Sequence, residues 1–374
     1  MRARQWYLDA MKAEQLWKVS TGKGITVAVL DTGVDSTVSE LQGVQVLPGR
    51  NFFDEGGGPG RIDEKDRERH GTNMAMTIAG NGLGGGVKGL APEAKILPVK
   101  VGIHGLMALG PATKGIRYAV DNGAKVINMS FGGSDDQDET AQWQAAVDYA
   151  LQKGALVLAS AGNNGLEAKR HPAGIPGVIA VGALDTKGKV TKFSNYGDHV
   201  ALAAPGDDIP GRCSNDKNTY CETFGTSQAT AIASASAALI WSAHPDWTAN
   251  QVLRVMMETA GHVGPVPSKY IGYGSIRPAQ VLLEGKGDPG PPDVNPLLAA
   301  RASQSPAPQT SPSPESTGAS DGGQSSQGSP SKAPETAAGS DEGGLPLWAI
   351  VASAAAGVVV IGVVVAVSVR SRRA

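Results

Sequence analysis

The feature that most constrains the fold is an alternation of short apolar runs with helix-like segments between residues 24 and 285. Five runs have the length and composition of buried strands: residues 24–30, 95–101, 124–129, 155–160 and 177–181. Helix-like segments intervene at about 71–80, 111–122 and 138–153. Strands that alternate with helices are typical of βαβ units, in which helices cover both faces of a parallel sheet. We therefore predict an α/β fold of three layers around a mostly parallel sheet.

Composition excludes several other classes of protein. A net charge of −2 gives no support to a nucleic-acid binder, which is usually basic. Two cysteines are too few for a small disulfide scaffold or for a four-thiolate zinc site. We predict no metal, no other cofactor and no nucleic-acid partner.

Composition changes sharply near Gly285. Residues 286–344 are rich in Pro, Ser, Gly and Ala and almost lack large apolar side chains, so we predict a disordered linker. Residues 345–369 carry no charge, and a helix of that length reaches roughly 37 Å, enough to cross a ~30 Å hydrocarbon core. The alternative is a buried core helix, but no partner domain follows. We predict one transmembrane helix in a lipid membrane.

Three arginines in residues 370–374 follow the predicted span. Basic residues that flank a span favour the cytoplasmic side, so we predict a cytoplasmic C-terminal tail and a body outside the cell membrane. An exported body needs an export signal, yet residues 1–20 contain no apolar signal core and predict an amphipathic helical lead-in instead. We expect the signal peptide to be missing from this form of the chain.

Polar residues gather where chemistry is expected in such a sheet. Asp31 ends the first predicted strand, and the sequence SAGNNG, residues 160–165, ends the fourth. Chemistry in open parallel sheets lies at the carboxyl ends of the strands. His70 opens one helical segment, and Ser227 opens another that is apolar on all sides. The start of a buried helix offers free N–H groups and a positive dipole end, which stabilise an oxyanion.

The motifs around these residues are DTGVD, HGT, SAGNNG and GTSQAT, in this order along the chain. They resemble the subtilisin-like serine proteases, and the similarity runs over residues 17–285 and includes VINMSFGG at 126–133. The Pro-rich linker and the predicted span further resemble the mycosins, the membrane-anchored subtilisin-like proteases of type VII secretion systems. The resemblance implies a subtilisin-like peptidase domain over residues 1–285 and a protein or peptide substrate.

The resemblance also implies a role for each motif residue. Ser227 would be the nucleophile, His70 the general base, and Asp31 the carboxylate that orients the imidazole. Asn163 would donate its side-chain amide to the oxyanion, beside the backbone N–H of Ser227.

Two segments would hold the substrate, according to the same resemblance. Ser130, Phe131 and Gly132 would pair with an extended peptide through backbone hydrogen bonds. Ala161 and Gly162 would line the opposite wall of the cleft.

Each of these residues also has a plain structural interpretation. Asp31 and Asn163 are residue types common in turns, and Ser227 is a common helix N-cap. Asp35 is a rival carboxylate, although it lies past the predicted strand. The other histidines lack the HGT context, and we expect them to be structural or exposed: His104, His171, His199, His244 and His262.

The chain departs from the family pattern at several positions. Arg69 stands where the family usually has glycine before the histidine, at the end of a charged run, residues 63–69, that we expect to be a solvated loop. Residues 81–86 lie where many subtilisins bind calcium, but they include no carboxylate, which hard cations favour. We therefore predict no calcium there.

Cys213 and Cys221 flank a short polar loop just before Ser227. Outside the cell they are expected to form a disulfide bond. Two free thiols or a metal pair are the alternatives, and no second pair of ligands accompanies the cysteines.

Together with the resemblance to the mycosins, the sequence thus implies a membrane-anchored serine endopeptidase that acts at the extracytoplasmic face on proteins linked to type VII secretion. The main alternative is a structural stabiliser of a secretion complex, associated with its subunits, in which proteolysis is secondary. A third is a binding module with a dead site, against which the presence of Asp31, His70, Asn163 and Ser227 argues.

Overall fold

A computed structural model of the chain describes residues 1–54, 57–63, 69–103, 106–133, 136–213 and 219–304. The predicted span at 345–369 and the basic tail at 370–374 lie outside these residues, as does most of the predicted linker. Within the part that is described, no helix is long and apolar enough to cross a membrane.

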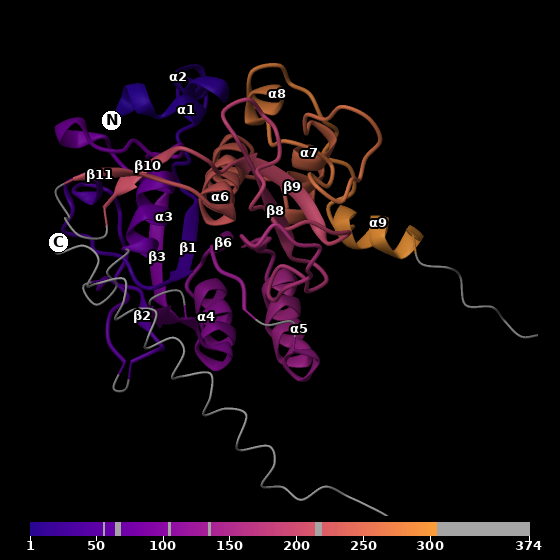
Figure 1. The fold of residues 1–374 in the computed structure, drawn as a ribbon, viewed down its shortest axis with the longest axis horizontal. Helices are drawn as coiled ribbons and strands as arrows, with labels where there is room; N and C mark the ends of the chain where they lie inside the picture. The colour runs from indigo at the N-terminus through magenta and orange to yellow at the C-terminus, as the bar shows by residue number, and fades with distance from the viewer. Residues whose placement is uncertain (55–56, 64–68, 104–105, 134–135, 214–218, 305–374) are drawn as a thin grey trace, which may run out of the picture. The chain divides into compact units, whose positions relative to one another are not determined.

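A parallel sheet of seven strands forms the middle layer of the described domain (Figure 1). In spatial order the strands are β2 (Arg50–Asn51), β3 (Lys95–Lys100), β1 (Thr26–Asp31), β6 (Val126–Met129), β7 (Leu156–Ser160), β8 (Ile179–Leu184) and β9 (Val200–Pro205). All neighbouring strands run parallel. The predicted α/β fold with a mostly parallel sheet is confirmed.

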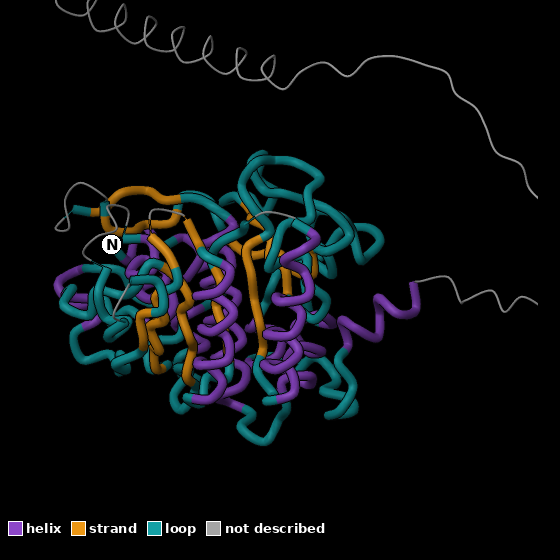
Figure 2. The backbone as a smooth tube through the Cα atoms, turned by 90° about the horizontal axis from the view of Figure 1, so that it is seen from below, coloured by secondary structure: helices purple, strands orange, loops and turns teal. Residues whose placement is uncertain are grey.

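Helices cover both faces of the sheet, which explains why its strands are apolar along their whole length. On one face lie α3 (His70–Ala79) and α6 (Thr226–Ala243), and on the other α4 (Leu109–Asp121) and α5 (Gln137–Gln152). Figure 2 shows α4 and α5 in front of the strands, in the view from below. Side chains on the two faces form two separate cores. As predicted, α6 is buried on all sides, from Thr226 to Trp241.

Shorter elements surround these layers. The remaining helices are α1 (Trp6–Ala10), α2 (Ala13–Leu16), α7 (Ala249–Glu258), α8 (Pro278–Leu282) and α9 (Pro296–Gln304), with single turns η1 (Arg2–Arg4), η2 (Ser39–Leu41) and η3 (Leu83–Gly85). Two small antiparallel hairpins pair β4 (Gly102–Ile103) with β5 (Leu106–Met107), and β10 (Ile209–Arg212) with β11 (Tyr220–Thr223). A disulfide bond joins Cys213 to Cys221 in the second hairpin, as predicted.

The strand order reverses at β1. The chain leaves β1 toward β3 on one side and later returns to β6 on the other side. In open parallel sheets a ligand site lies outside the carboxyl ends of the strands at such a switch point. The residues that follow β1, β6 and β7 therefore reach one crevice although they are far apart in sequence.

The N-terminal lead-in differs from the single amphipathic helix that we expected. Lys12 has a left-handed backbone, with φ of 59°, and divides the segment into α1 and α2. This break lets the side chains of Tyr7, Leu8 and Leu16 all become fully buried against the domain. Packing of the two short helices therefore overrides helical continuity.

The predicted start of the linker at residue 286 is wrong for residues 286–304. Thr248 Oγ1 and Asn250 Nδ2 donate hydrogen bonds to the Pro292 carbonyl, at 2.9 and 3.0 Å. Leu297 in α9 is only 2% exposed. The prediction missed the packing of residues 286–304 because it rested on the low average hydrophobicity of the whole segment 286–344. The linker from residue 305 to 344 stays a prediction.

Candidate active site

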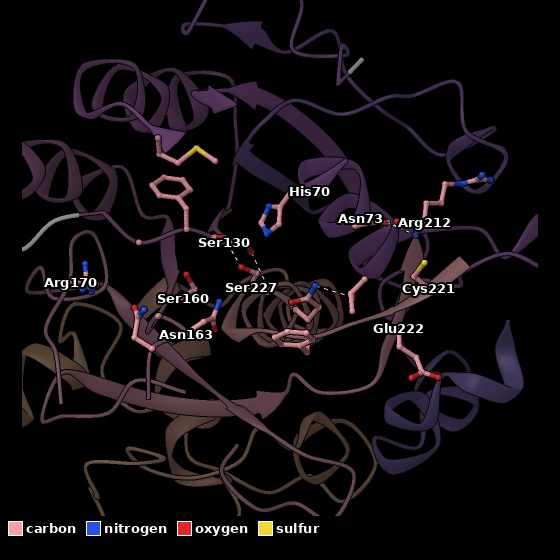
Figure 3. A pocket seen from close by; sticks show the side chains of 18 of the residues that line it. His70, Asn73, Ser130, Ser160, Asn163, Arg170, Arg212, Cys221, Glu222 and Ser227 are labelled. Carbon is pink, nitrogen blue, oxygen red and sulfur yellow. Dashed lines mark hydrogen bonds between the residues drawn. The ribbon is translucent and has the colours of Figure 1, made fainter. Parts of the chain in front are cut away.

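A cleft of about 680 Å³ opens at the carboxyl edge of the sheet (Figure 3). Its lining comes from the start of α3, the segment 130–132 after β6, the turn after β7, the start of α6, and the β10–β11 hairpin. His70, Ser130, Phe131, Gly132, Gly162, Asn163 and Ser227 all line it. The structure thus brings together most of the residues that the sequence singled out.

Asp31 and His70 form the inner part of this site. Asp31 is fully buried at the end of β1, and its Oδ1 lies 2.8 Å from His70 Nδ1. The same oxygen accepts the Thr32 N–H at 2.8 Å. Because a carboxylate only accepts, we assign the His70 proton to Nδ1, which leaves the lone pair on Nε2. His70 is thereby held in the tautomer that a general base needs.

Ser227 lies in the first turn of α6 and exchanges hydrogen bonds with Ser130. Ser227 Oγ donates to the Ser130 carbonyl at 2.8 Å, and Ser130 Oγ donates to the Ser227 carbonyl at 3.0 Å. Asn128 Nδ2 in turn donates to Ser130 Oγ at 2.9 Å. Because a hydroxyl has one proton, Ser227 must rotate away from Ser130 before it gives that proton to a base. Catalytic hydrogen bonds commonly align only when substrate is bound.

Asn163 is oriented by Thr226. Its Oδ1 accepts from the Thr226 N–H at 2.8 Å and from Thr226 Oγ1 at 2.9 Å. Both donors identify that atom as the oxygen, so the amide nitrogen Nδ2 faces away from Thr226. Gly225 has φ of 146°, and a Cβ there would lie 3.2 Å from Asn163 Nδ2. Glycine therefore leaves room for an amide donor next to the Ser227 backbone N–H.

Ala161 is the one predicted wall residue that the structure does not place in the cleft. Its side chain is fully buried, and its N–H donates to the Val181 carbonyl at 3.1 Å. Ser160 and Gly162, on either side of it, line the wall instead. Successive residues of an extended segment face opposite sides, so Ser160 and Gly162 face the cleft while Ala161 faces the protein interior.

We expected the charged run at residues 63–69 to be a solvated loop. Its first residue, Asp63, is instead fully buried. Its carboxylate accepts from Thr32 Oγ1 at 2.8 Å, from the Thr72 N–H at 3.1 Å and from Thr72 Oγ1. Asp63 therefore joins the end of β1 to the first turn of α3, the two elements that carry Asp31 and His70. No pattern in the sequence separates Asp63 from the charged residues that follow it.

Asp35, the rival carboxylate, is bound elsewhere. Arg69 Nη1 donates to Asp35 Oδ2 at 2.9 Å, and Thr37 donates from its N–H and its hydroxyl. Burial by itself raises the pKa of Asp35, but the hydrogen bonds from Thr37 and Arg69 outweigh burial and lower the pKa. Arg69 holds a left-handed backbone, with φ of 49°, which explains why glycine suits this position in the family.

The other histidines within the described residues do not line the cleft. His171 Nε2 lies 2.8 Å from Thr140 Oγ1, His199 is buried at the start of β9, His244 stacks on Trp247, and the exposed His262 contacts Gly264. His104 lies outside the described residues. The four described histidines are thus buried, packed or exposed outside the cleft, in line with the expectation that they are structural or exposed.

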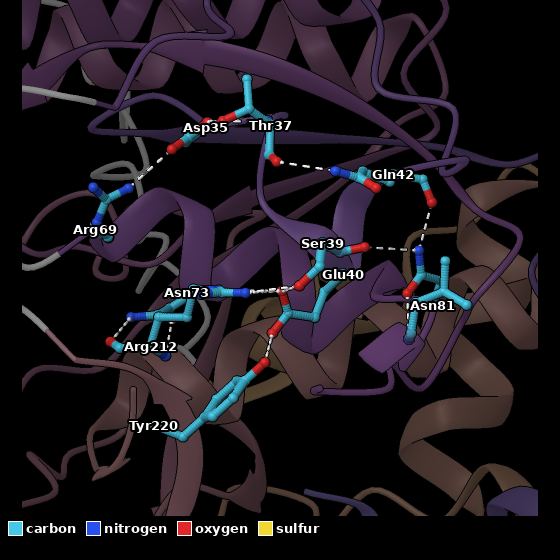
Figure 4. Close-up of polar contacts among 11 residues, drawn as sticks. Asp35, Thr37, Ser39, Glu40, Gln42, Arg69, Asn73, Asn81, Arg212 and Tyr220 are labelled. Atoms are coloured by element: carbon cyan, nitrogen blue, oxygen red, sulfur yellow. Dashed lines mark hydrogen bonds and ion pairs between the residues drawn. The ribbon is translucent and has the colours of Figure 1, made fainter. Parts of the chain in front are cut away.

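A buried ion pair anchors the β10–β11 hairpin beside the cleft (Figure 4). Arg212 donates from Nη2 and Nε to Glu40 Oε2, at 2.6 and 3.1 Å, and the Tyr220 hydroxyl donates to Glu40 Oε1. Asn73 in α3 accepts the Arg212 N–H at 2.8 Å. Sequence reasoning missed this network, because its members are distant in the chain and belong to no motif.

The Asn81 side chain in segment 81–86 is bound by backbone groups of the protein. Asn81 Oδ1 accepts from the Leu83 N–H at 2.6 Å, and its Nδ2 donates to the Ser39 carbonyl at 3.2 Å. Across the described ranges, no group of three or more His, Cys, Asp or Glu side chains is arranged to hold a metal ion.

Comparisons with known proteins agree with this geometry. The profile of the Subtilase family, peptidase S8, matches residues 22–274, a range that includes every cleft residue named above. The chain is 39% identical over 244 residues to the "Major intracellular serine protease" of Bacillus subtilis (strain 168), covering 63% of this chain and 74% of that protein.

Solved structures of secretion-system proteases are also similar. MycP1 from Mycobacterium smegmatis superposes with a TM-score of 0.67 at 27% identity, over 77% of this chain and 86% of that one. MycP3, a protease from the type VII (ESX-3) secretion system, superposes with a TM-score of 0.64 at 29% identity, over 74% and 88% of the two chains. The predicted resemblance to subtilisin-like proteases, and to mycosins in particular, is confirmed.

Proposed function

Because this chain belongs to the subtilase family and is a serine endopeptidase, we propose that Ser227, His70 and Asp31 are the triad that cleaves its protein or peptide substrates. The observation that carries this proposal is the 2.8 Å contact of Asp31 Oδ1 with His70 Nδ1 at the edge of the cleft that Ser227 lines.

The proposed reaction begins when an extended peptide binds along segment 130–132. Ser227 Oγ turns from the Ser130 carbonyl, gives its proton to His70 Nε2 and attacks the scissile carbonyl carbon. The oxyanion that forms accepts from Asn163 Nδ2 and from the Ser227 N–H. Asp31 stabilises the imidazolium, which then protonates the leaving amine.

Water completes the reaction in a second round of the same steps. His70 takes a proton from the water as it attacks the acyl-enzyme, and the oxyanion site is used again. Collapse of this second intermediate returns the proton to Ser227 and releases the new carboxylic acid.

Hydrolysis of an unfolded protein substrate tests the proposed triad. Ser227→Ala removes the nucleophile and is expected to abolish cleavage. Ser236→Ala is the matched control, because Ser236 lies on the same helix and donates only to the Ile232 carbonyl, at 2.9 Å. Cleavage that persists in purified Ser227→Ala protein would show that another residue is the nucleophile.

We also propose that residues 345–369 anchor the chain in the cell membrane, with residues 370–374 in the cytoplasm and the peptidase domain outside. The uncharged run and the arginines after it support this topology. Protease treatment of intact cells should release the domain by cutting within residues 305–344. A domain that is released only after lysis would contradict the topology.

A role in type VII secretion is the finer part of the proposal. The similarity to MycP3 from such a system supports it, and the same similarity keeps the stabiliser function as a second candidate. A Ser227→Ala chain, expressed at its normal level in the native host, separates the two. Loss of secretion indicates that cleavage is needed, whereas normal secretion indicates a structural role.

A further inference from the structure

Four ionisable side chains line the cleft in the described part of the chain. They are His70, Arg170, Arg212 and Glu222. Three of them already have an oppositely charged or titratable partner, which is Asp31 for His70, Glu40 for Arg212, and Arg4 for Glu222. Arg170 is the fourth, and no carboxylate among the described residues lies within ion-pair distance of it.

The Arg170 guanidinium makes few contacts for a half-buried group. Nη1 donates to the Gly133 carbonyl at 3.3 Å, a long hydrogen bond. Nε is buried and has no hydrogen-bond acceptor in the structure. A buried donor without an acceptor is unfavourable, so the Arg170 guanidinium is only weakly held in the free protein. A ligand carboxylate pairs with such a planar guanidinium in a bidentate manner.

Arg170 stands at one end of the cleft. The Gly133 N–H donates to the His171 carbonyl at 2.7 Å, so the chain after segment 130–132 runs beside residues 170–171. In Figure 3, Ser160 lies between Ser227 and Arg170, whereas Arg212 and Glu222 lie on the opposite side. The cleft therefore has a hairpin end, where the charges are paired, and an Arg170 end.

The walls next to Arg170 are built from small residues. Gly132 is on one wall, and Ser160 and Gly162 are on the other. Gly162 has φ of 109°, and a Cβ there would lie 2.3 Å from Asn195 Nδ2, so this position stays a glycine. In the reaction proposed above, the substrate residue that supplies the scissile carbonyl would have its backbone on segment 130–132 and its oxygen at Asn163. The side chain of that residue would enter the space between these walls, toward Arg170.

We propose that Arg170 binds the carboxylate of an acidic substrate residue directly before the scissile bond, and so makes the enzyme select Asp or Glu at that position. This inference rests on the proposed function of Ser227 and names the class of substrate that the same cleft takes. A glutamate and a glutamine have the same size, so only the charge-assisted pair distinguishes them. Such a pair favours the glutamate substrate by roughly tenfold or more in kcat/KM.

Fluorogenic peptides that differ only by Glu, Gln or Lys at this position test the inference. The unaltered protein is expected to cleave the Glu peptide about tenfold faster than the Gln peptide. Arg170→Gln should bring this ratio near one, and Arg170→Glu should reverse the order so that the Lys peptide is cleaved best. Lys169→Gln is the matched control, because it removes the same charge from an exposed neighbour that does not line the cleft, and the ratio should persist.

The outcomes separate the inference from the proposed function on which it rests. Cleavage of Glu and Gln peptides at equal rates would overturn the role of Arg170 and leave the triad intact. A ratio that persists in Arg170→Gln, or that is lost in Lys169→Gln, would also overturn it. Failure to cleave every peptide, together with no fluorophosphonate labelling of Ser227, would overturn the proposed function as well. Should Arg170→Gln not fold, as judged by melting temperature, Arg170→Met supplies the same comparison.

Discussion

At the scale of single residues, Asn163 illustrates how one orientation decides a chemical role. Thr226 uses both its N–H and its hydroxyl to bind the Asn163 oxygen. The amide nitrogen is thereby fixed before substrate arrives, and a fixed donor stabilises developing charge without reorganising. If Asn163 were only a turn residue, there would be no reason for both Thr226 groups to bind its side-chain oxygen.

Asn163→Ala is expected to lower kcat by roughly 10²–10³-fold with little change in KM, a magnitude known from removal of an oxyanion-hole donor in subtilisin. The reason is that, in the proposed mechanism, the Asn163 amide contacts the substrate oxygen only as negative charge develops. Steady-state kinetics and the melting temperature are measured on the same preparation. A near-normal kcat with a lowered melting temperature would support the turn interpretation instead.

The sequence located the proposed catalytic residues but not the groups that hold them. Asp31, His70 and Ser227 were found because each lies in a contiguous motif. Asp63 was missed, because burial of one charged residue in a charged run depends on contacts with Thr32 and Thr72 that fold together only in three dimensions.

At the scale of elements, the Glu40–Arg212 pair connects η2 to the β10–β11 hairpin. Burial by itself raises the pKa of Glu40, but the Tyr220 hydroxyl and the Arg212 guanidinium outweigh burial and lower the pKa. Arg212 is 7% exposed at its side chain and Glu40 is fully buried. The position of the β10–β11 hairpin, which lines one end of the cleft, thus depends on the ion pair between Arg212 and the buried Glu40 carboxylate.

Arg212→Met is expected to reduce the free energy of unfolding by roughly 3–5 kcal/mol, because it strands the buried Glu40 carboxylate. The double variant Glu40→Gln with Arg212→Met should lose less than Arg212→Met alone, since no charge then remains unpaired. Lys269→Met, which breaks an exposed pair with Glu167, is the control and should cost within about 1 kcal/mol. Equal losses for the single and the double variant in denaturant titrations would contradict this account.

His199 links β9 to α9, because Arg301 Nη2 donates to the His199 carbonyl at 2.9 Å. Burial lowers the pKa of His199 to about 4; Asp198 acts against this shift, while Lys169 and Arg301 add to it. In an unfolded chain a histidine titrates near ~6.5. The unfolded state therefore takes up the proton first as the pH falls. The stability contribution is complete above pH ~6.5 and is lost as the pH falls toward ~4.

The unfolding free energy should accordingly fall by about 1.4 kcal/mol per pH unit through this group between pH ~6.5 and ~4. His199→Gln removes the titrating ring, so one proton fewer is taken up on unfolding and the free energy of unfolding should fall less steeply with pH. Urea unfolding across this pH range measures the slope. His262→Gln, at an exposed position, is the control. An unchanged slope in His199→Gln would assign the acid sensitivity to other groups.

Strands and helices were predictable where burial imposes a simple pattern. The runs that became β1, β3, β6 and β7 were located to within about two residues, because both faces of this sheet are covered and their residues are apolar throughout. The strand β9 was missed, since its sequence VALAAP is rich in alanine, which has low strand propensity. The hairpin strands β10 and β11 gave no apolar pattern at all.

At the scale of the whole molecule, the peptidase domain extends beyond the point where composition changes. Residues 286–304 fold back along α7, through hydrogen bonds to Pro292 and through the buried side chain of Leu297. Composition reports the average of a long segment, whereas packing is decided by a few side chains and carbonyl groups within it.

A chain that ends at residue 304 is therefore expected to melt at the temperature of the full-length protein. A chain that ends at residue 285 should melt several degrees lower, because it exposes the surface that α9 and Leu297 cover. Differential scanning calorimetry on both truncations measures this directly. Equal melting temperatures would show that residues 286–304 add nothing to the stability of the domain.

In the proposed mechanism, Ser227 is the nucleophile that Asp31 and His70 activate. Labelling with a fluorophosphonate, followed by intact-mass measurement and peptide mapping, tests this claim most directly. We expect a single adduct on Ser227, much slower labelling in His70→Ala and none in Ser227→Ala, while Ser236→Ala labels normally. An adduct on another residue, or labelling of Ser227→Ala at the rate of the unaltered protein, would contradict it.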